Sequence, residues 1–171
     1  MKTTNSYLTD HLKDKAVIFN PSEGEIFAIG NSSVTLKVTG DITNGQLGVY
    51  EIALGPGTVG AQLHYHRYTS ETFIVTKGTL TIQLADRITE AKEGAVVYIP
   101  AFTPHGFSNT SDDEVKVMLV FNPGQGREGF FKGMHEILSS ATPDPDDFLK
   151  LYNKYDSFPA DPSLLLPEVS Q

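Results

Sequence analysis

The feature that most constrains this chain is a series of short β-prone runs, separated by turn residues, between residues 16 and 121. In several runs apolar and polar residues alternate, which places one face of a strand in a core and the other in solvent. Sequences such as Asn44-Gly45 and Asn122-Pro123-Gly124 provide the turns. The clearest runs are residues 34–38, 48–54, 63–76, 79–84, 95–99 and 115–121. We therefore predict an all-β fold with seven or eight strands in an antiparallel sandwich or barrel.

The pattern changes after Pro123. Residues 127–138 place Phe130, Phe131 and Met134 at helical spacing, and residues 146–155 resemble a second short helix that Asp144 can cap. Three prolines in the last stretch argue against a regular element there. The predicted organisation is a tail at residues 1–15, a barrel at 16–123, a helical segment at 124–156 and an extended or disordered tail at 157–171.

Composition limits the classes of partner and of site. The chain has 171 residues, and its 13 Lys and Arg against 21 Asp and Glu give a net charge of −8 without a basic stripe, so we expect neither nucleic acid nor membrane as a partner. There are no cysteines, so a transition metal must bind nitrogen and oxygen ligands. Residues 1–15 lack an apolar run of signal-peptide length, and we expect a cytoplasmic protein.

The segment from residue 60 to 78 carries the strongest chemical signal. Side chains two apart on a strand project to the same face, so His64 and His66 can both point into a barrel. Glu71 follows after four residues, enough for a tight bend, and its carboxylate can face back toward the pair. A further histidine, His105, lies between two proline-marked bends at residues 94–109. We predict that these four residues converge on one metal ion.

The two segments resemble the paired motifs of the cupin superfamily: His-x-His, four residues, Glu, six residues, Gly; then Gly, five residues, Pro, and four residues further on His, followed three residues later by Asn. Thr58 and Phe102 stand where the family usually has glycines. The resemblance implies a double-stranded β-helix, or jelly-roll barrel, with short C-terminal helices. It also implies one divalent transition metal ion (Fe, Mn, Ni, Zn or Co) bound by His64, His66, Glu71 and His105. For Asn109 a structural role and a site role stay open.

Within that superfamily the chain looks most like quercetin-dioxygenase-like cupins. That resemblance implies a metal-dependent dioxygenase acting on a small aromatic or enolisable compound, with Glu71 as both ligand and base, and with Phe73, Phe102 and Phe107 lining the substrate pocket. A metal-dependent isomerase or epimerase of a sugar or hydroxy acid is the first alternative. It would need basic groups in the pocket, and the nearest cations in the motif, Arg67 and Lys77, are expected to face outward. A non-catalytic ligand-binding cupin is the second alternative.

We also expect a homodimer. An open barrel with free edge strands gains from having them covered by a second copy, and residues 16–29 are the expected region of contact.

Overall fold

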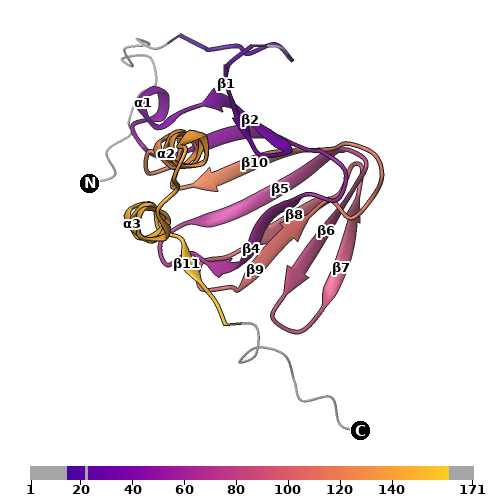
Figure 1. The fold of residues 1–171 in the computed structure, drawn as a ribbon. Helices are drawn as coiled ribbons and strands as arrows, with labels where there is room; N and C mark the ends of the chain where they lie inside the picture. Colours follow the sequence, from indigo (N-terminus) through magenta and orange to yellow (C-terminus); the bar gives the residue numbers. More distant parts are fainter. Residues whose placement is uncertain (1–14, 22, 162–171) are drawn as a thin grey trace, which may run out of the picture.

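The computed structural model describes residues 15–21 and 23–161, so most of the predicted N-terminal tail lies outside the described residues (Figure 1). Strands dominate up to residue 122, and two helices follow. The strands are β1 (Glu25–Ile29), β2 (Ser32–Val38), β3 (Gly48–Leu54), β4 (Val59–Tyr65), β5 (Ser70–Lys77), β6 (Thr79–Leu84), β7 (Ile88–Lys92), β8 (Val96–Ile99), β9 (His105–Ser108), β10 (Val115–Asn122) and β11 (Phe158–Pro159). The helices are α1 (Gly40–Thr43), α2 (Glu128–Ser139) and α3 (Pro145–Lys154).

The strands form two antiparallel sheets. One has the order β1-β2-β3-β10-β5-β8 and the other the order β11-β4-β9-β6-β7. Consecutive strands β4 and β5 belong to different sheets, so the chain crosses from one to the other just after His66. This is the predicted double-stranded β-helix, and the all-β prediction is confirmed.

The core lies between the inward faces of the two sheets. Burial alternates perfectly along β3 and β10, whose inward residues are almost wholly shielded from solvent. The six-stranded sheet also contributes Phe73 and Val75, and the five-stranded sheet contributes Leu80, Ile82 and Phe107. Period-two alternation in the sequence therefore identified the core-facing side of these strands correctly.

Both predicted helices are present within one residue of their expected bounds, and α3 is capped as expected, with the Asp144 carboxylate accepting from the backbone N–H of Asp146. Asn44 and Gly45 adopt the left-handed backbone typical of a hairpin turn, with φ of 53° and 74°. They do not join two strands directly, however, because they end the short helix α1 that leads into β3.

Residues 158–159 form β11, which pairs antiparallel with β4, where the prolines had been expected to exclude a regular element. Pro159 is compatible with this position because β11 is the edge strand of its sheet, where a missing N–H breaks no inner ladder. Figure 1 shows α2 and α3 side by side at one end of the barrel, with β11 running from α3 back to the sheet. The C-terminal part of the described chain therefore closes that end.

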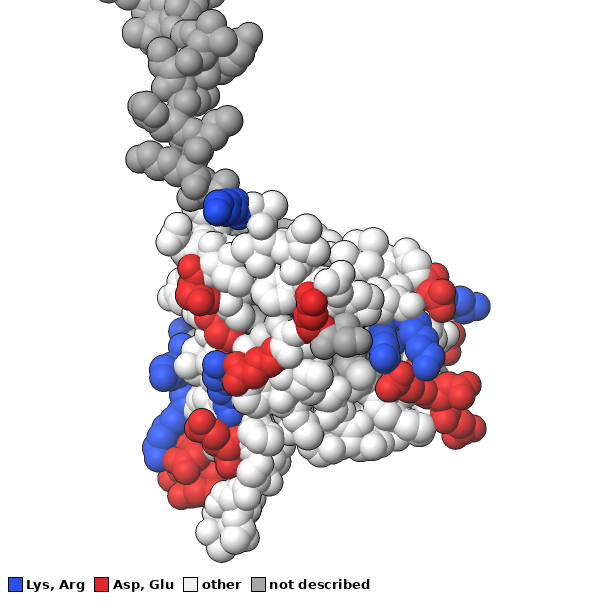
Figure 2. Space-filling model, turned by 90° about the horizontal axis from the view of Figure 1, so that it is seen from above, with Lys and Arg blue, Asp and Glu red and all other residues white. Residues whose placement is uncertain are grey.

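The surface shows no single dominant charge on the face seen in Figure 2, where acidic side chains lie beside basic ones. Within the described residues no helix is long and apolar enough to cross a membrane.

Candidate metal centre

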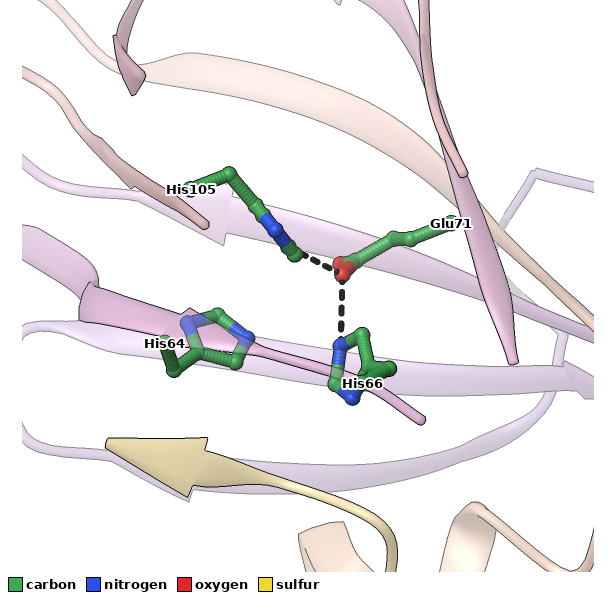
Figure 3. A group of neighbouring side chains, drawn as sticks. All are labelled: His64, His66, Glu71 and His105. Carbon is green, nitrogen blue, oxygen red and sulfur yellow. Dashed lines mark hydrogen bonds and ion pairs between the residues drawn. The ribbon is translucent and has the colours of Figure 1, made fainter. Parts of the chain in front are cut away.

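Three strand regions bring the four predicted ligands together. His64 lies in β4 and His66 directly follows it, Glu71 begins the inward face of β5, and His105 opens β9. The pairing of β4 with β9 sets His64 opposite His105. Figure 3 shows the three imidazoles and the carboxylate pointing at one another. One ligand atom from each residue lies within 4.8 Å of the others, so this cluster could hold a metal ion.

Backbone carbonyls orient the rings. Nδ1 of His64 lies 2.8 Å from the Gln62 oxygen, Nδ1 of His105 lies 2.9 Å from the Thr103 oxygen, and Nδ1 of His66 bonds the carbonyl of Asp156. A carbonyl only accepts hydrogen bonds, so each Nδ1 carries the proton, and Nε2 of the neutral ring presents a lone pair. The nitrogen that donates in each ring is therefore the one turned away from the cluster.

The contacts inside the cluster fit a cation. Nε2 of His66 and of His105 lie 3.0 Å and 2.8 Å from the same oxygen of Glu71. Neutral rings with Nδ1 protonated would aim lone pairs at a carboxylate oxygen, which is favourable only if a proton or a cation lies between them. Adjacent ligands of an octahedral ion are roughly 3 Å apart when the bonds are about 2.1 Å. The donor atoms present thus match a divalent transition metal.

Burial and mutual contacts shift the pKa values of these groups. Burial lowers the pKa of His64 to about 3, which keeps that ring neutral. Burial alone would raise the pKa of Glu71, but the contacts of its carboxylate with His105 and His66, which are favourable when those rings are protonated, hold it well below its usual range. The pKa of His105 is raised, because its bond to Glu71 outweighs the opposing effect of burial. The cluster therefore combines an ionised carboxylate with a neutral imidazole at His64.

A residue far along the chain supports the centre from outside. Asp156 accepts the ring N–H of His66 through its backbone carbonyl. Its carboxylate accepts the backbone N–H groups of Arg67, Tyr68 and Thr69 at 2.9, 2.9 and 3.2 Å. These amides form the turn between His66 and Glu71, so one aspartate fixes both a ligand and the bend that sets the spacing of two ligands. Such outer contacts orient metal ligands and tune their affinity.

The cluster opens onto a cavity of about 480 Å³ between the two sheets and the helices. Most of its wall is aliphatic or aromatic, and His64 and Glu71 form part of it. The helical side contributes Arg127, Phe130, Tyr152 and Ser157. A cavity of this size and lining suits a small, largely apolar molecule held by few polar groups.

The three predicted pocket phenylalanines have different positions. Phe107 lines the cavity. Phe73 is fully buried and packs edge-to-face against the rings of Phe107 and His105, behind the cavity wall. Phe102 is 67% exposed and stacks on Tyr65 at the surface. Its φ of 61° is the left-handed backbone that the family's glycine would supply there, and this turn directs the side chain outward.

The role left open for Asn109 is structural. Its side chain is buried and donates to the backbone oxygens of Leu54, Gly55 and Asp113, while its oxygen accepts from Ser111. It organises the loop between β9 and β10. His135 in α2 takes no part in the cluster and bonds the carbonyl of Ala28, and His11 lies outside the described residues.

Asp156, Arg127 and Ser157 were not identified from the sequence as site residues. No local pattern marks them, because they reach the site only when the helices fold back over the barrel. A weak signal existed for Arg127, which directly precedes the predicted amphipathic helix.

A jelly-roll barrel with inward-facing histidines and a glutamate at a cavity defines a class of metal-site β-barrels. Residues 50–121 match the family model of the cupin domain. No curated protein matches the chain.

Solved structures agree on the fold. A sugar phosphate isomerase of the cupin superfamily from Silicibacter pomeroyi is 26% identical, with a TM-score of 0.50 over 55% of this chain and 60% of that chain. A predicted oxalate decarboxylase from Thermotoga maritima is 17% identical, with a TM-score of 0.58 over 62% of this chain and 98% of that one. KdgF from Halomonas sp. is 18% identical, with a TM-score of 0.55 over 63% and 94%. The alignment spans less than two thirds of the isomerase.

Proposed function

We propose that this protein is a metal-dependent enzyme of the dioxygenase type that acts on a small aromatic or enolisable compound. The observation that carries the proposal is the four-residue donor cluster at the wall of a largely apolar cavity. A divalent transition metal bound there would supply Lewis-acid activation and, if it is iron, redox chemistry with dioxygen. His64, His66, Glu71 and His105 would hold it.

The remaining residues suit this chemistry by orienting the substrate and excluding water. Phe107, Leu119 and Phe121 line the cavity with flat or branched apolar groups that match a planar molecule. Glu71 is the proposed base for a bound enol or phenol.

A second candidate is a metal-dependent isomerase or epimerase of a sugar or hydroxy acid. That function needs a basic group in the pocket, and the cations of the motif do not provide one, since Arg67 and Lys77 are exposed. Arg127, from the start of α2, does line the cavity and is buried. The Silicibacter pomeroyi protein, named as a sugar phosphate isomerase, adds to the case for this candidate.

Two assays on one preparation distinguish the candidates. The protein is analysed for metal as purified, then loaded separately with Fe, Mn, Ni and Co. A dioxygenase consumes oxygen with flavonols, diketones or catechols, and absence of uptake with all four metals would contradict that function. An isomerase exchanges substrate hydrogen with deuterium from solvent under anaerobic conditions when given sugars or hydroxy acids. Loss of either activity in His66→Ala would connect it to the cluster.

A further inference from the structure

Arg127 is a buried cation with no carboxylate against it. Its side chain is only 7% exposed, and among the described residues no acidic group lies within ion-pair distance of it. Burial lowers its pKa to about 10, against the opposing influence of the Glu71 charge, so the guanidinium stays charged. A buried charge is costly unless it is paired, which makes an anion-free Arg127 an unfavourable resting arrangement.

The guanidinium is held in place by its surroundings. Its carbon lies 4.6 Å from the ring centroid of Phe121 and 4.1 Å from that of Phe130, and one terminal nitrogen donates to the carbonyl of Tyr155. These contacts fix the plane of the group. They leave its Nε–H, which is buried, without a partner among the described residues. A guanidinium fixed in this way is pre-organised to accept a planar, two-oxygen anion.

A second unpartnered group lies in the same wall. The hydroxyl of Ser157 is buried and has no hydrogen-bond partner in the described part of the chain, and Ser157, like Arg127, lines the cavity. The backbone N–H of Ser157 bonds the carbonyl of Tyr152, so the segment from α3 to β11 positions this residue as it does Arg127. Native proteins rarely leave two buried donors unsatisfied in one place.

The pair is close to the metal cluster. The ring of Phe121, which stacks on Arg127, also contacts the ring of His66, with centroids 5.8 Å apart. Arg127 and Ser157 line the same cavity as His64 and Glu71 of the cluster. One ligand in the cavity can therefore contact both groups of residues.

We propose that Arg127 and Ser157 form a carboxylate-binding subsite, and that the substrate is a small monocarboxylate whose remaining oxygen atoms face the metal cluster. Arg127 is the single Lys or Arg among the described residues that line the cavity, which suits one negative charge and not the two of a phosphate monoester. The inference adds a substrate class to the proposed function. It rests on that function only for the oxygen atoms that face the metal cluster. It names the charge that the substrate must carry under either candidate reaction.

The test compares benzoate with benzamide, which share size and shape but differ in charge, by nuclear magnetic resonance titration of the full chain. The protein is used both metal-free and loaded with zinc, whose content is measured first. The wild type should bind benzoate about 10-fold more tightly than benzamide in both forms, the usual value of a hydrogen bond to a charged group. Equal affinities would overturn the proposal, as would tighter binding of phenyl phosphate than of benzoate.

Variants identify the residues that cause the preference for benzoate over benzamide. Arg127→Met should abolish it while leaving zinc content unchanged, and Ser157→Ala should reduce it roughly 3-fold, as expected for one neutral hydrogen bond. Lys132→Met, in the helix that Arg127 precedes but outside this cavity, is the control with the same charge change and should keep the preference. A preference that survives Arg127→Met and requires zinc would place the carboxylate on the metal and overturn the subsite. If Arg127→Met does not fold, an undiminished preference in Ser157→Ala overturns it.

The two proposals fail separately. A protein that binds no metal but prefers benzoate contradicts only the metal-dependent function. A metal-loaded, active protein that ignores the charge of the ligand contradicts only the carboxylate subsite.

Discussion

The two sides of the cavity are built in different ways. On one side β4, β5 and β9 present the four metal-binding candidates from two short sequence motifs. On the other side α2, α3 and β11 bring in Arg127, Tyr152 and Ser157, which no motif marks. The motif side offers donors for an ion, while the closing side offers a cation, ring faces and a hydroxyl. Under the two proposals above, the comparison assigns the general chemistry to the barrel and the choice of substrate to the segment that covers its end.

The strongest test of the motif side is His66→Ala. Removing one of four ligands should lower metal affinity by more than the roughly 10- to 100-fold that loss of an outer contact typically costs, so metal should be absent after dialysis. The fold should persist, since the rest of the core is untouched. Elemental analysis with circular dichroism measures both. His135→Ala, which changes a histidine outside the cluster, is the control, and full metal content in His66→Ala would contradict the site.

Asp156→Ala tests whether the closing side supports the motif side. The change leaves three backbone N–H groups of the turn at residues 67–69 without their acceptor. We expect roughly 10-fold weaker metal binding and a loss of about 2 kcal/mol in the free energy of unfolding. Chelator competition and urea denaturation give the two values. Asp147→Ala, at an exposed helix position, should change neither, and unchanged metal affinity in Asp156→Ala would separate the two sides.

Asn109→Ala should affect the stability of the barrel alone. Three backbone carbonyls and the Ser111 N–H lose their bonds to this side chain, for an expected cost of about 2 kcal/mol in the free energy of unfolding. Metal content should equal that of the wild type, because no cluster residue contacts Asn109. Reduced metal content in folded Asn109→Ala would show that this loop takes part in the site after all.

The smallest effect is expected for Arg67→Met. The Arg67 guanidinium lies 4.0 Å from the ring centroid of Phe158 in β11, a contact at the surface. Such exposed cation–ring contacts are worth roughly 0.5–1 kcal/mol, so the free energy of unfolding should fall by no more than that. Arg87→Met is the matched control, since within the described residues the ion pair of the Arg87 side chain is with the neighbouring Asp86 alone. A larger loss in Arg67→Met would mean that β11 depends on this contact for its attachment.

Much of the fold follows from the sequence because strand alternation is a local property. The runs that became β2, β3, β6 and β10 show it clearly, and the helical spacing that predicts α2 is local too. The short strands β7 and β9 were missed, since four or five residues give too little alternation to recognise. The prediction that Pro159 excludes a regular element was also wrong, because it depended on a property that is not local. A proline is excluded only from inner strands, and the sequence does not say that β11 lies at an edge.

The candidate site likewise has one part that local sequence spacing predicts and one part that it does not. Spacing within a strand determines that His64 and His66 share a face, so the donor cluster was predictable. The contact of His66 with Asp156 joins residues 90 positions apart, and no spacing rule reaches that far. Phe102 was expected to line the pocket, but its side chain lies at the surface. Its left-handed backbone, which only the structure shows, directs it to the surface. The homodimer remains a prediction that a measurement of mass in solution can check.

The contact of Asp156 with a residue far earlier in the chain also affects when the candidate site can form during synthesis. A ribosome delivers the chain from its N-terminal end, so all four donor residues emerge well before the aspartate that holds His66 and its turn. Until that residue arrives, the imidazole lacks the partner that fixes its tautomer, and the bend before Glu71 lacks its anchor. Metal captured by the nascent chain would therefore be held by unsupported donors. Under the proposed metal-dependent function, tight loading would have to wait until Asp156 has emerged and packed against His66 and its turn.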